Sequence, residues 1–186
     1  MEDAVEDAEL RDELLRRAEV DQQARRACTP LFAKARDGMV HPDDLAPDEQ
    51  AIVDRLTEVD RDNTRWLGEL VERRGWPTHS LVGEQAAVSA WLLAQHADQD
   101  PALQRRCLDL MCAAPTGDVT PMYTAYLTDR VLLAEGKSQV YGTQVTLVDG
   151  EYQPLDLRDP ETVDERRAVA GLCTLAEYRR TMHEES

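Results

Sequence analysis

The chain has 186 residues, enough for one domain with a hydrophobic core and a tight fit for two independent domains. Hydrophobic residues make up 42% of the composition, so we expect the chain to fold rather than stay disordered. The formal net charge is −16, and the acidic excess is spread along the chain. A surface of this kind repels phosphate groups, so we expect binding neither to nucleic acids nor to membranes.

Compartment signals favour the cytoplasm. The acidic N-terminal segment 1–10 lacks the apolar stretch of a signal peptide, and the best apolar run, 86–94, is too short to span a bilayer. None of the cysteines forms a C-x-x-C pair, so in a reducing compartment we interpret them as buried thiols rather than disulfides or zinc ligands. They are Cys28, Cys107, Cys112 and Cys173.

The N-terminal half predicts three helices. The first runs from about residue 7 to 27, Pro30 ends or bends it, and a loop follows at 36–47. Pro47 suits the start of a second helix, which an apolar stripe carries to residue 74 before Gly75 ends it. The third helix, from about 83 to 97, is apolar almost all round and therefore predicted to be central.

The C-terminal half predicts shorter elements. Asp100 and Thr120 each precede a proline, which predicts helices over about 101–113 and 121–135. A hairpin at about 138–155 turns at Asp149-Gly150 with type I′ geometry, and helices follow at about 160–183, the last opened by a Thr174–Glu177 capping box. The sequence thus predicts a mainly α fold: a single-domain bundle of about five to seven helices with one small β-hairpin near the C-terminus.

Polar residues on the apolar faces of the first two helices indicate a site. Asp21 and Arg25 share the apolar face of the first helix at a spacing that lets them pair, unless this is simply an exposed helix end. Asp60 and Asn63 lie on the apolar stripe of the second helix, at positions where the pattern calls for apolar residues. The alternative there is a helix break at residues 60–64, with a new cap, although the unbroken phase favours one helix.

The third and fifth helices carry similar signals. Gln85, Ser89 and His96 form one narrow polar strip, which predicts a polar cavity or partner, whereas His96 taken alone is better explained as a satisfied core or helix-end histidine. Arg130 lies near the middle of the apolar face of the fifth helix, with Asp129 at its edge. A buried guanidinium needs an anion, supplied either by one of the chain's aspartates or by a ligand carboxylate or phosphate.

Several short motifs together resemble a bacterial family known only as domain of unknown function 6624, over about residues 10–178. The matching residues are Asp21-Gln22 with Arg25, Asp60 with Asn63, Gly75-Trp76-Pro77 leading to Ser80-Leu81-Val82-Gly83, Gln95-His96-Ala97-Asp98, Tyr126-Leu127 with Asp129-Arg130, and Gln139 with Tyr141-Gly142-Thr143-Gln144. The resemblance implies a shared architecture and site but no activity. It adds Tyr141 and Gln144, on a turn-like segment whose alternative role is packing.

The combined set suits acid–base work on a small polar or anionic molecule. We expect His96 to move a proton and Asp60 either to orient His96 or to hold a cationic substrate group, with Tyr141 as a further catalytic group. Arg130 and Arg25 suit an anionic group. The remaining binding candidates are Asp21, Asn63, Gln85, Asp129 and Gln144. No cofactor motif and no metal site is predicted, although an oxygen-rich site of Asp60, Asp98 and His96 stays open.

Three functions remain open at this point. The first is an enzyme acting on a small polar or anionic substrate by acid–base catalysis. The second is a non-catalytic module that binds a ligand or protein through the same pocket or its acidic surface. The third is a structural polar network that fixes helix register, with function elsewhere. Oligomeric state is not predicted.

Overall fold

A computed structural model describes residues 6–34, 41–148 and 150–184, with no side chains described at 32–34 and 42. The chain divides into two compact units, Met1–Leu103 and Gln104–Ser186, and the boundary falls inside a helix. Each unit is described by itself. The single-domain organisation stays a prediction.

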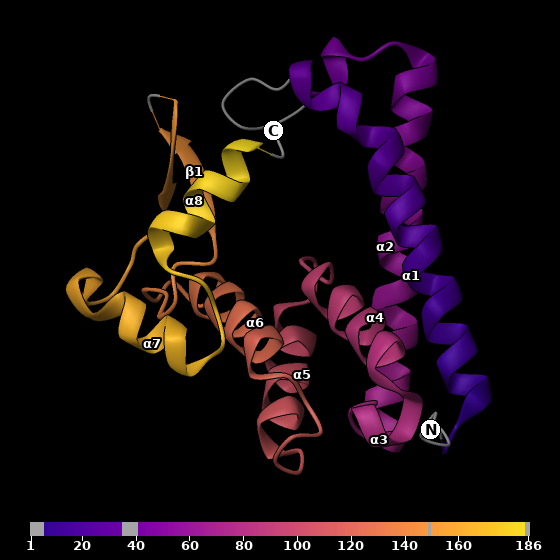
Figure 1. Cartoon of the computed structure of the whole chain (residues 1–186). Coiled ribbons are helices and arrows are strands. Elements are labelled where there is room, and N and C mark those ends of the chain that lie inside the picture. The colour runs from indigo at the N-terminus through magenta and orange to yellow at the C-terminus, as the bar shows by residue number, and fades with distance from the viewer. Residues whose placement is uncertain (1–5, 35–40, 149, 185–186) are drawn as a thin grey trace. The chain divides into compact units, whose positions relative to one another are not determined.

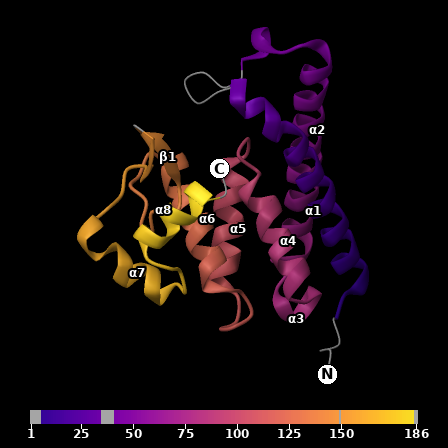
Figure 2. The same ribbon diagram turned by 45° about the horizontal axis from the view of Figure 1, so that its top comes forward.

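The first unit is built on two long antiparallel helices, α1 (Ala8–Cys28) and α2 (Pro47–Arg74), which lie side by side in both views (Figures 1 and 2). Asp7 caps α1 by accepting a hydrogen bond from the Leu10 backbone N–H at 2.9 Å. Two 3₁₀ segments, η1 (Thr29–Lys34) and η2 (Pro42–Asp44), stand between α1 and α2. The predicted loop over 36–47 lies partly outside the described residues.

Helix α2 is continuous over 28 residues, so the alternative of a break at residues 60–64 is wrong. Pro47 occupies its first turn, as predicted, and Gly75 ends it with φ 77°. A positive φ is readily adopted only by glycine, which explains the abrupt end of the helix at this position. The uninterrupted helix keeps Asp60 and Asn63 on the flank that faces α1.

Two helices complete the first unit: α3 (His79–Val82) and α4 (Glu84–Gln95). The four-residue α3 was not predicted, because it is shorter than one clear apolar period; Gly83, with φ 79°, separates it from α4. Helix α4 packs against both α1 and α2 (Figure 1), and its small residues are buried on several faces, as its composition predicted. Leu14, Leu67 and Leu93 form the centre of this core.

The second unit begins within α5 (Pro101–Ala113), where the Asp100 carboxylate caps the Leu103 N–H at 3.0 Å as predicted. It continues through α6 (Pro121–Ala134), β1 (Val145–Val148), β2 (Glu151–Pro154), η3 (Pro160–Thr162), α7 (Val163–Val169) and α8 (Leu175–Glu184). The two strands pair antiparallel with Val148 opposite Glu151. Gly150 has φ 82°, but Asp149 lies outside the described residues, so the turn type stays a prediction.

These elements confirm a mainly α fold with one small C-terminal hairpin. The described residues contain eight α-helices, one more than the upper predicted count, and the unpredicted α3 is the additional one. Within the described ranges, no helix combines the length and apolar character needed to cross a membrane.

Candidate functional site

Asp21 and Arg25 meet one turn apart on α1. The Arg25 Nε lies 3.3 Å from the Asp21 Oδ2, which confirms the predicted pairing. The Asp21 side chain is completely buried, whereas 30% of the Arg25 side chain is exposed. The alternative of an exposed helix end is therefore wrong, and a buried carboxylate stands at the base of a partly open cluster.

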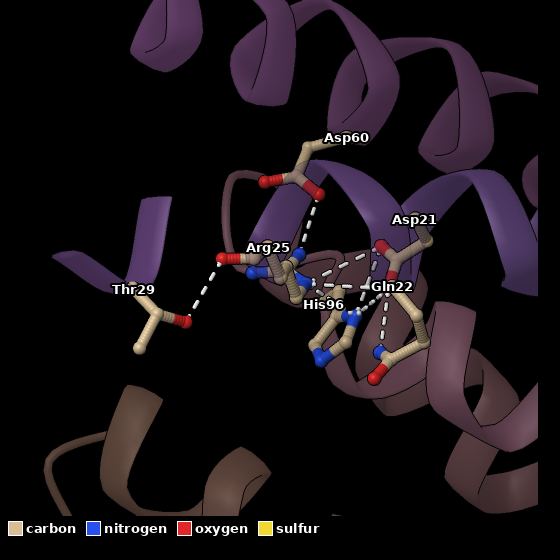
Figure 3. A network of polar contacts seen from close by, with 6 residues as sticks. All are labelled: Asp21, Gln22, Arg25, Thr29, Asp60 and His96. Atoms are coloured by element: carbon tan, nitrogen blue, oxygen red, sulfur yellow. Dashed lines mark hydrogen bonds and ion pairs between the residues drawn. The ribbon is translucent and has the colours of Figure 1, made fainter. Parts of the chain in front are cut away.

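His96 joins this pair from the C-terminal end of α4, 75 residues further along the chain (Figure 3). Its Nδ1 lies 2.9 Å from Asp21 Oδ2 and 3.0 Å from Oδ1. The Arg25 Nε is also 2.9 Å from Nδ1. An ionised carboxylate only accepts and a guanidinium only donates, so Nδ1 donates to Asp21 in the tautomer that carries a proton there and accepts from the Arg25 N–H in the other. The neutral ring with Nδ1–H leaves Nε2 as its basic nitrogen.

Asp60 reaches the cluster from α2, where its Oδ1 accepts a hydrogen bond from Arg25 Nη2 at 2.5 Å (Figure 3). Burial raises the pKa of Asp60, the charge of Arg25 opposes this rise, and the nearby Asp21 charge adds to it, so the net pKa is raised. Burial also acts to raise the pKa of Asp21, but the hydrogen bond and charge of His96 and Arg25 outweigh it, so that pKa is lowered. The two carboxylates are therefore tuned in opposite directions.

This arrangement has the parts of a proton-transfer site. A fully buried carboxylate fixes one nitrogen of an imidazole whose side chain is 19% exposed, so the ring is both oriented and reachable. Arg25 supplies a positive charge beside the ring, and Asp60 supplies a carboxyl group whose ionisation is disfavoured. Three helices converge on the cluster: α1, α2 and α4.

Other predicted site residues of the first unit lie outside this cluster. Asn63 is buried one turn further along α2, where its Oδ1 accepts a hydrogen bond from Arg17 at 2.9 Å. Gln85 is exposed near the start of α4, about 16 Å along the helix axis from His96, so the predicted polar strip does not converge. Ser89 donates to the Gln85 backbone carbonyl.

The oxygen-rich alternative with Asp98 gains no support. Asp98 is exposed. Across the described ranges, no group of three or more histidine, cysteine, aspartate or glutamate side chains is placed to hold a metal ion.

The second unit holds a different polar cluster around Asp129, whose side chain is completely buried on α6. Its carboxylate accepts hydrogen bonds from the backbone N–H groups of Val140 at 2.7 Å, Tyr141 at 3.0 Å and Thr143 at 2.9 Å. The Thr143 hydroxyl donates a further bond at 2.9 Å. Asp129 therefore holds the turn-like segment 140–143 in one conformation.

The carbonyl side of the same segment is held by the C-terminal helices. Arg166 Nε donates to the Val140 carbonyl at 2.8 Å, and Arg167 Nη1 donates to the Tyr141 carbonyl at 2.7 Å. The Tyr178 hydroxyl donates to the Thr143 carbonyl at 2.9 Å. Gly142 adopts φ 67°, and a Cβ atom there would lie 3.2 Å from a Leu175 side-chain carbon. We call residues 140–143, bonded from both sides, the clamped loop.

Asp129, predicted at the edge of the apolar face of its helix, is completely buried. Ala125 and Asp129 are buried on one side of α6, and Leu127 and Val131 are buried about 200° around it. A helix covered on two sides has no single apolar stripe, so helix phase cannot rank its residues. Arg130, predicted at the centre of the face, is half-buried.

Gln144 completes this segment. Its backbone N–H and carbonyl bond the side chain of the buried Gln139 at 3.0 and 2.9 Å, and its side-chain amide donates to the Thr143 hydroxyl at 3.2 Å. The predicted set is thus divided: Asp21, Arg25, Asp60 and His96 cluster in the first unit, while Asp129, Tyr141 and Gln144 belong to the second.

Sequence reasoning missed two arginines that organise these clusters. Arg17 bonds Asn63 and Asp62, and its guanidinium carbon lies 4.5 Å from the centre of the Trp66 ring. The fully buried Arg167 bonds the clamped loop. Both had a signal: Arg17 falls in phase with Leu10 and Leu14, and Arg167 falls in phase with Val163 and Ala170.

Comparison with known proteins gives one match. The model of a family of unknown function (DUF6624) matches residues 8–186. Neither a curated protein nor a solved structure matches the chain.

Proposed function

The chain belongs to DUF6624, a family of unknown function, and from the geometry of its own residues we propose that it is an enzyme using His96 for acid–base catalysis. The substrate class is a small polar or anionic molecule. The observation that carries this proposal is the 2.9 Å contact between His96 Nδ1 and the completely buried Asp21 carboxylate. In the Nδ1–H tautomer that this contact favours, the opposite nitrogen is left for proton transfer.

Each member of the cluster has a distinct role in this proposal. His96 Nε2 takes a proton from the substrate or from water and returns it later, while Asp21 is a positioning residue that fixes the ring and its tautomer. Arg25, which is partly exposed, faces an anionic group of the substrate. Asp60 is the carboxylate that such a group displaces from Arg25, because its own charge is poorly stabilised where it lies.

The test compares three proteins incubated with a small-molecule extract of the source cells: wild type, His96→Gln and His183→Gln. His183 is the matched control, since it is a partly exposed histidine of the second unit that the proposal does not use. We expect mass spectrometry to find compounds consumed by wild type and by His183→Gln but untouched by His96→Gln. Two-dimensional NMR spectra establish that each variant is folded.

Two outcomes contradict the proposal. Equal consumption by His96→Gln means that the histidine is not catalytic. An extract left unchanged by wild type favours the non-catalytic binding module instead. The role of Asp21 has its own readout: nitrogen NMR of the imidazole is expected to show a protonated Nδ1 in wild type, and this preference is expected to weaken in Asp21→Asn.

We place this activity in the cytoplasm. All four cysteines lie within the described residues and all are free thiols, two of them exposed. Exposed free thiols are typical of a reducing compartment.

A further inference from the structure

The second unit contains a cavity of about 350 Å³ that is open to solvent, several of its lining residues being exposed, and that the proposed catalysis does not use. It is bounded by the end of α5, the segment leading to α6, the start of α6 and the end of α7, and Tyr141 of the clamped loop lines it. Its volume is at the lower end of the range for small-molecule sites in proteins.

The walls of this cavity contain no charged residue. Met111, Val119 and Val169 are among its apolar members, and its polar groups come from Tyr141, Thr124 and Cys112. Charged residues make up 31% of the chain, so a lining without any differs clearly from the average composition of the protein. A charged ligand would lose part of its hydration against this uncharged lining, which disfavours it relative to a neutral one.

Tyr141 is a polar lining residue whose backbone is held by two buried partners. Its backbone N–H bonds Asp129 and its carbonyl bonds Arg167, both of which are completely buried. Burial, followed by the Asp129 charge, raises the pKa of Tyr141, so its hydroxyl stays protonated at neutral pH. Within the described part of the chain, no hydrogen bond occupies that hydroxyl. Because the backbone of Tyr141 is fixed, its hydroxyl is a donor that loses less conformational freedom on binding than one on a mobile segment.

We propose that this cavity is a binding site for a small, uncharged, largely apolar molecule whose hydrogen-bond acceptor meets the Tyr141 hydroxyl. The apolar walls take the ring or chain of the ligand, and the hydroxyl donates to a carbonyl or ether oxygen. This site is separate in composition from the charged His96 cluster and does not depend on its catalytic role.

Cys112 gives a direct measure of occupancy, because it lines the cavity and its thiol reacts with iodoacetamide. Cys173, also exposed but not part of the lining, is the control thiol within the same molecule. Alkylation of the full chain is followed by peptide mass spectrometry with benzamide, acetophenone or cyclohexanone present, and with benzoate or benzylamine as charged counterparts. We expect the neutral compounds to slow alkylation at Cys112 alone, with affinities in the millimolar range.

A substitution then tests the hydrogen bond. Tyr141→Phe keeps the ring and the backbone contacts, and is expected to weaken protection by benzamide about tenfold. Tyr152→Phe removes a hydroxyl from the hairpin and is expected to change nothing. The proposal is overturned if benzoate protects as well as benzamide, if no neutral compound protects Cys112, if Cys173 is slowed equally, or if Tyr141→Phe binds unchanged.

Discussion

Asp21 and Asp129 are both completely buried aspartates on helices, yet their surroundings differ in kind. Asp129 is bonded by three backbone N–H groups and a hydroxyl, none of which titrates near neutral pH. Asp21 is bonded by His96 and Arg25, which are partly exposed. The same residue type therefore fixes a loop in one unit and positions a reachable imidazole in the other. Both carboxylates are equally buried, so burial does not distinguish a structural role from a chemical one. The hydrogen-bond donors around each carboxylate do.

The largest effect is expected for Asp129→Asn. The substitution places an amide against several backbone donors that have no other acceptor, so we expect a loss of about 3–5 kcal/mol in the free energy of unfolding. Chemical denaturation measures it. Asp109→Asn, at an exposed aspartate of the same unit, is the control and is expected to change stability by less than about 0.5 kcal/mol. A loss below about 1 kcal/mol for Asp129→Asn would refute its structural role.

A smaller loss, about 2–3 kcal/mol, is expected for Asp21→Asn at neutral pH, because its side-chain partners can rearrange and reach water. The pKa of Asp21 is lowered in the fold, so its contribution is complete above its ordinary value of 3.8 and is lost as pH falls through the folded value. Denaturation curves of wild type and variant should therefore converge only in acid. Convergence between pH 7 and 5 would mean that another group is responsible.

Asp60→Asn is expected to have the opposite sign. The pKa of Asp60 is raised, so its ionisation weakens the fold at every pH above the folded value, and this cost disappears as pH falls toward 3.8. The variant should match wild type at neutral pH or exceed it by about 1 kcal/mol or less, with the gap closing in acid. Thermal melts from neutral to acidic pH measure it. A clear destabilisation would show that the Arg25–Asp60 pair is structural.

The smallest effect is expected at Gln85, which lies at the surface and away from the His96 cluster. Gln85→Ala should change the free energy of unfolding by about 0.5 kcal/mol or less and leave any His96-dependent turnover intact. Thermal melts and the extract assay together check this. A loss of turnover would restore Gln85 to the site.

Helix phase predicted much of the first cluster from local pattern. The i, i+4 spacing of Asp21 and Arg25 and the phase of Asp60 are local properties, and α2 is one regular helix against which they can be judged. The meeting of His96 with Asp21 is different, since 75 residues separate them and no local pattern encodes how α4 packs on α1. Helix phase marked each residue separately, and the resemblance to a family implied that they share a site.

The second unit was harder to predict for physical reasons. Its key contacts run from side chains to backbone, as in Asp129 to the clamped loop, and backbone groups carry no sequence signature. Helices covered on two sides, such as α6, blur the apolar stripe. Short helices such as α7 offer few turns, so the phase of Arg167 with Val163 and Ala170 is a weaker signal than the phase along α2.

Arg167 also constrains when the second unit can fold during synthesis. Its guanidinium is completely shielded by the Tyr141 carbonyl, the Cys173 carbonyl at 2.6 Å and the Tyr178 ring at 5.1 Å. A nascent chain that has emerged only as far as α7 lacks two of these three partners. Burying the Arg167 guanidinium at that stage would leave its charge without the groups that stabilise it, so the side chain stays in water. The clamped loop must therefore wait for residue 178 to leave the ribosome, whereas every side chain of the His96 cluster is available once residue 96 has emerged.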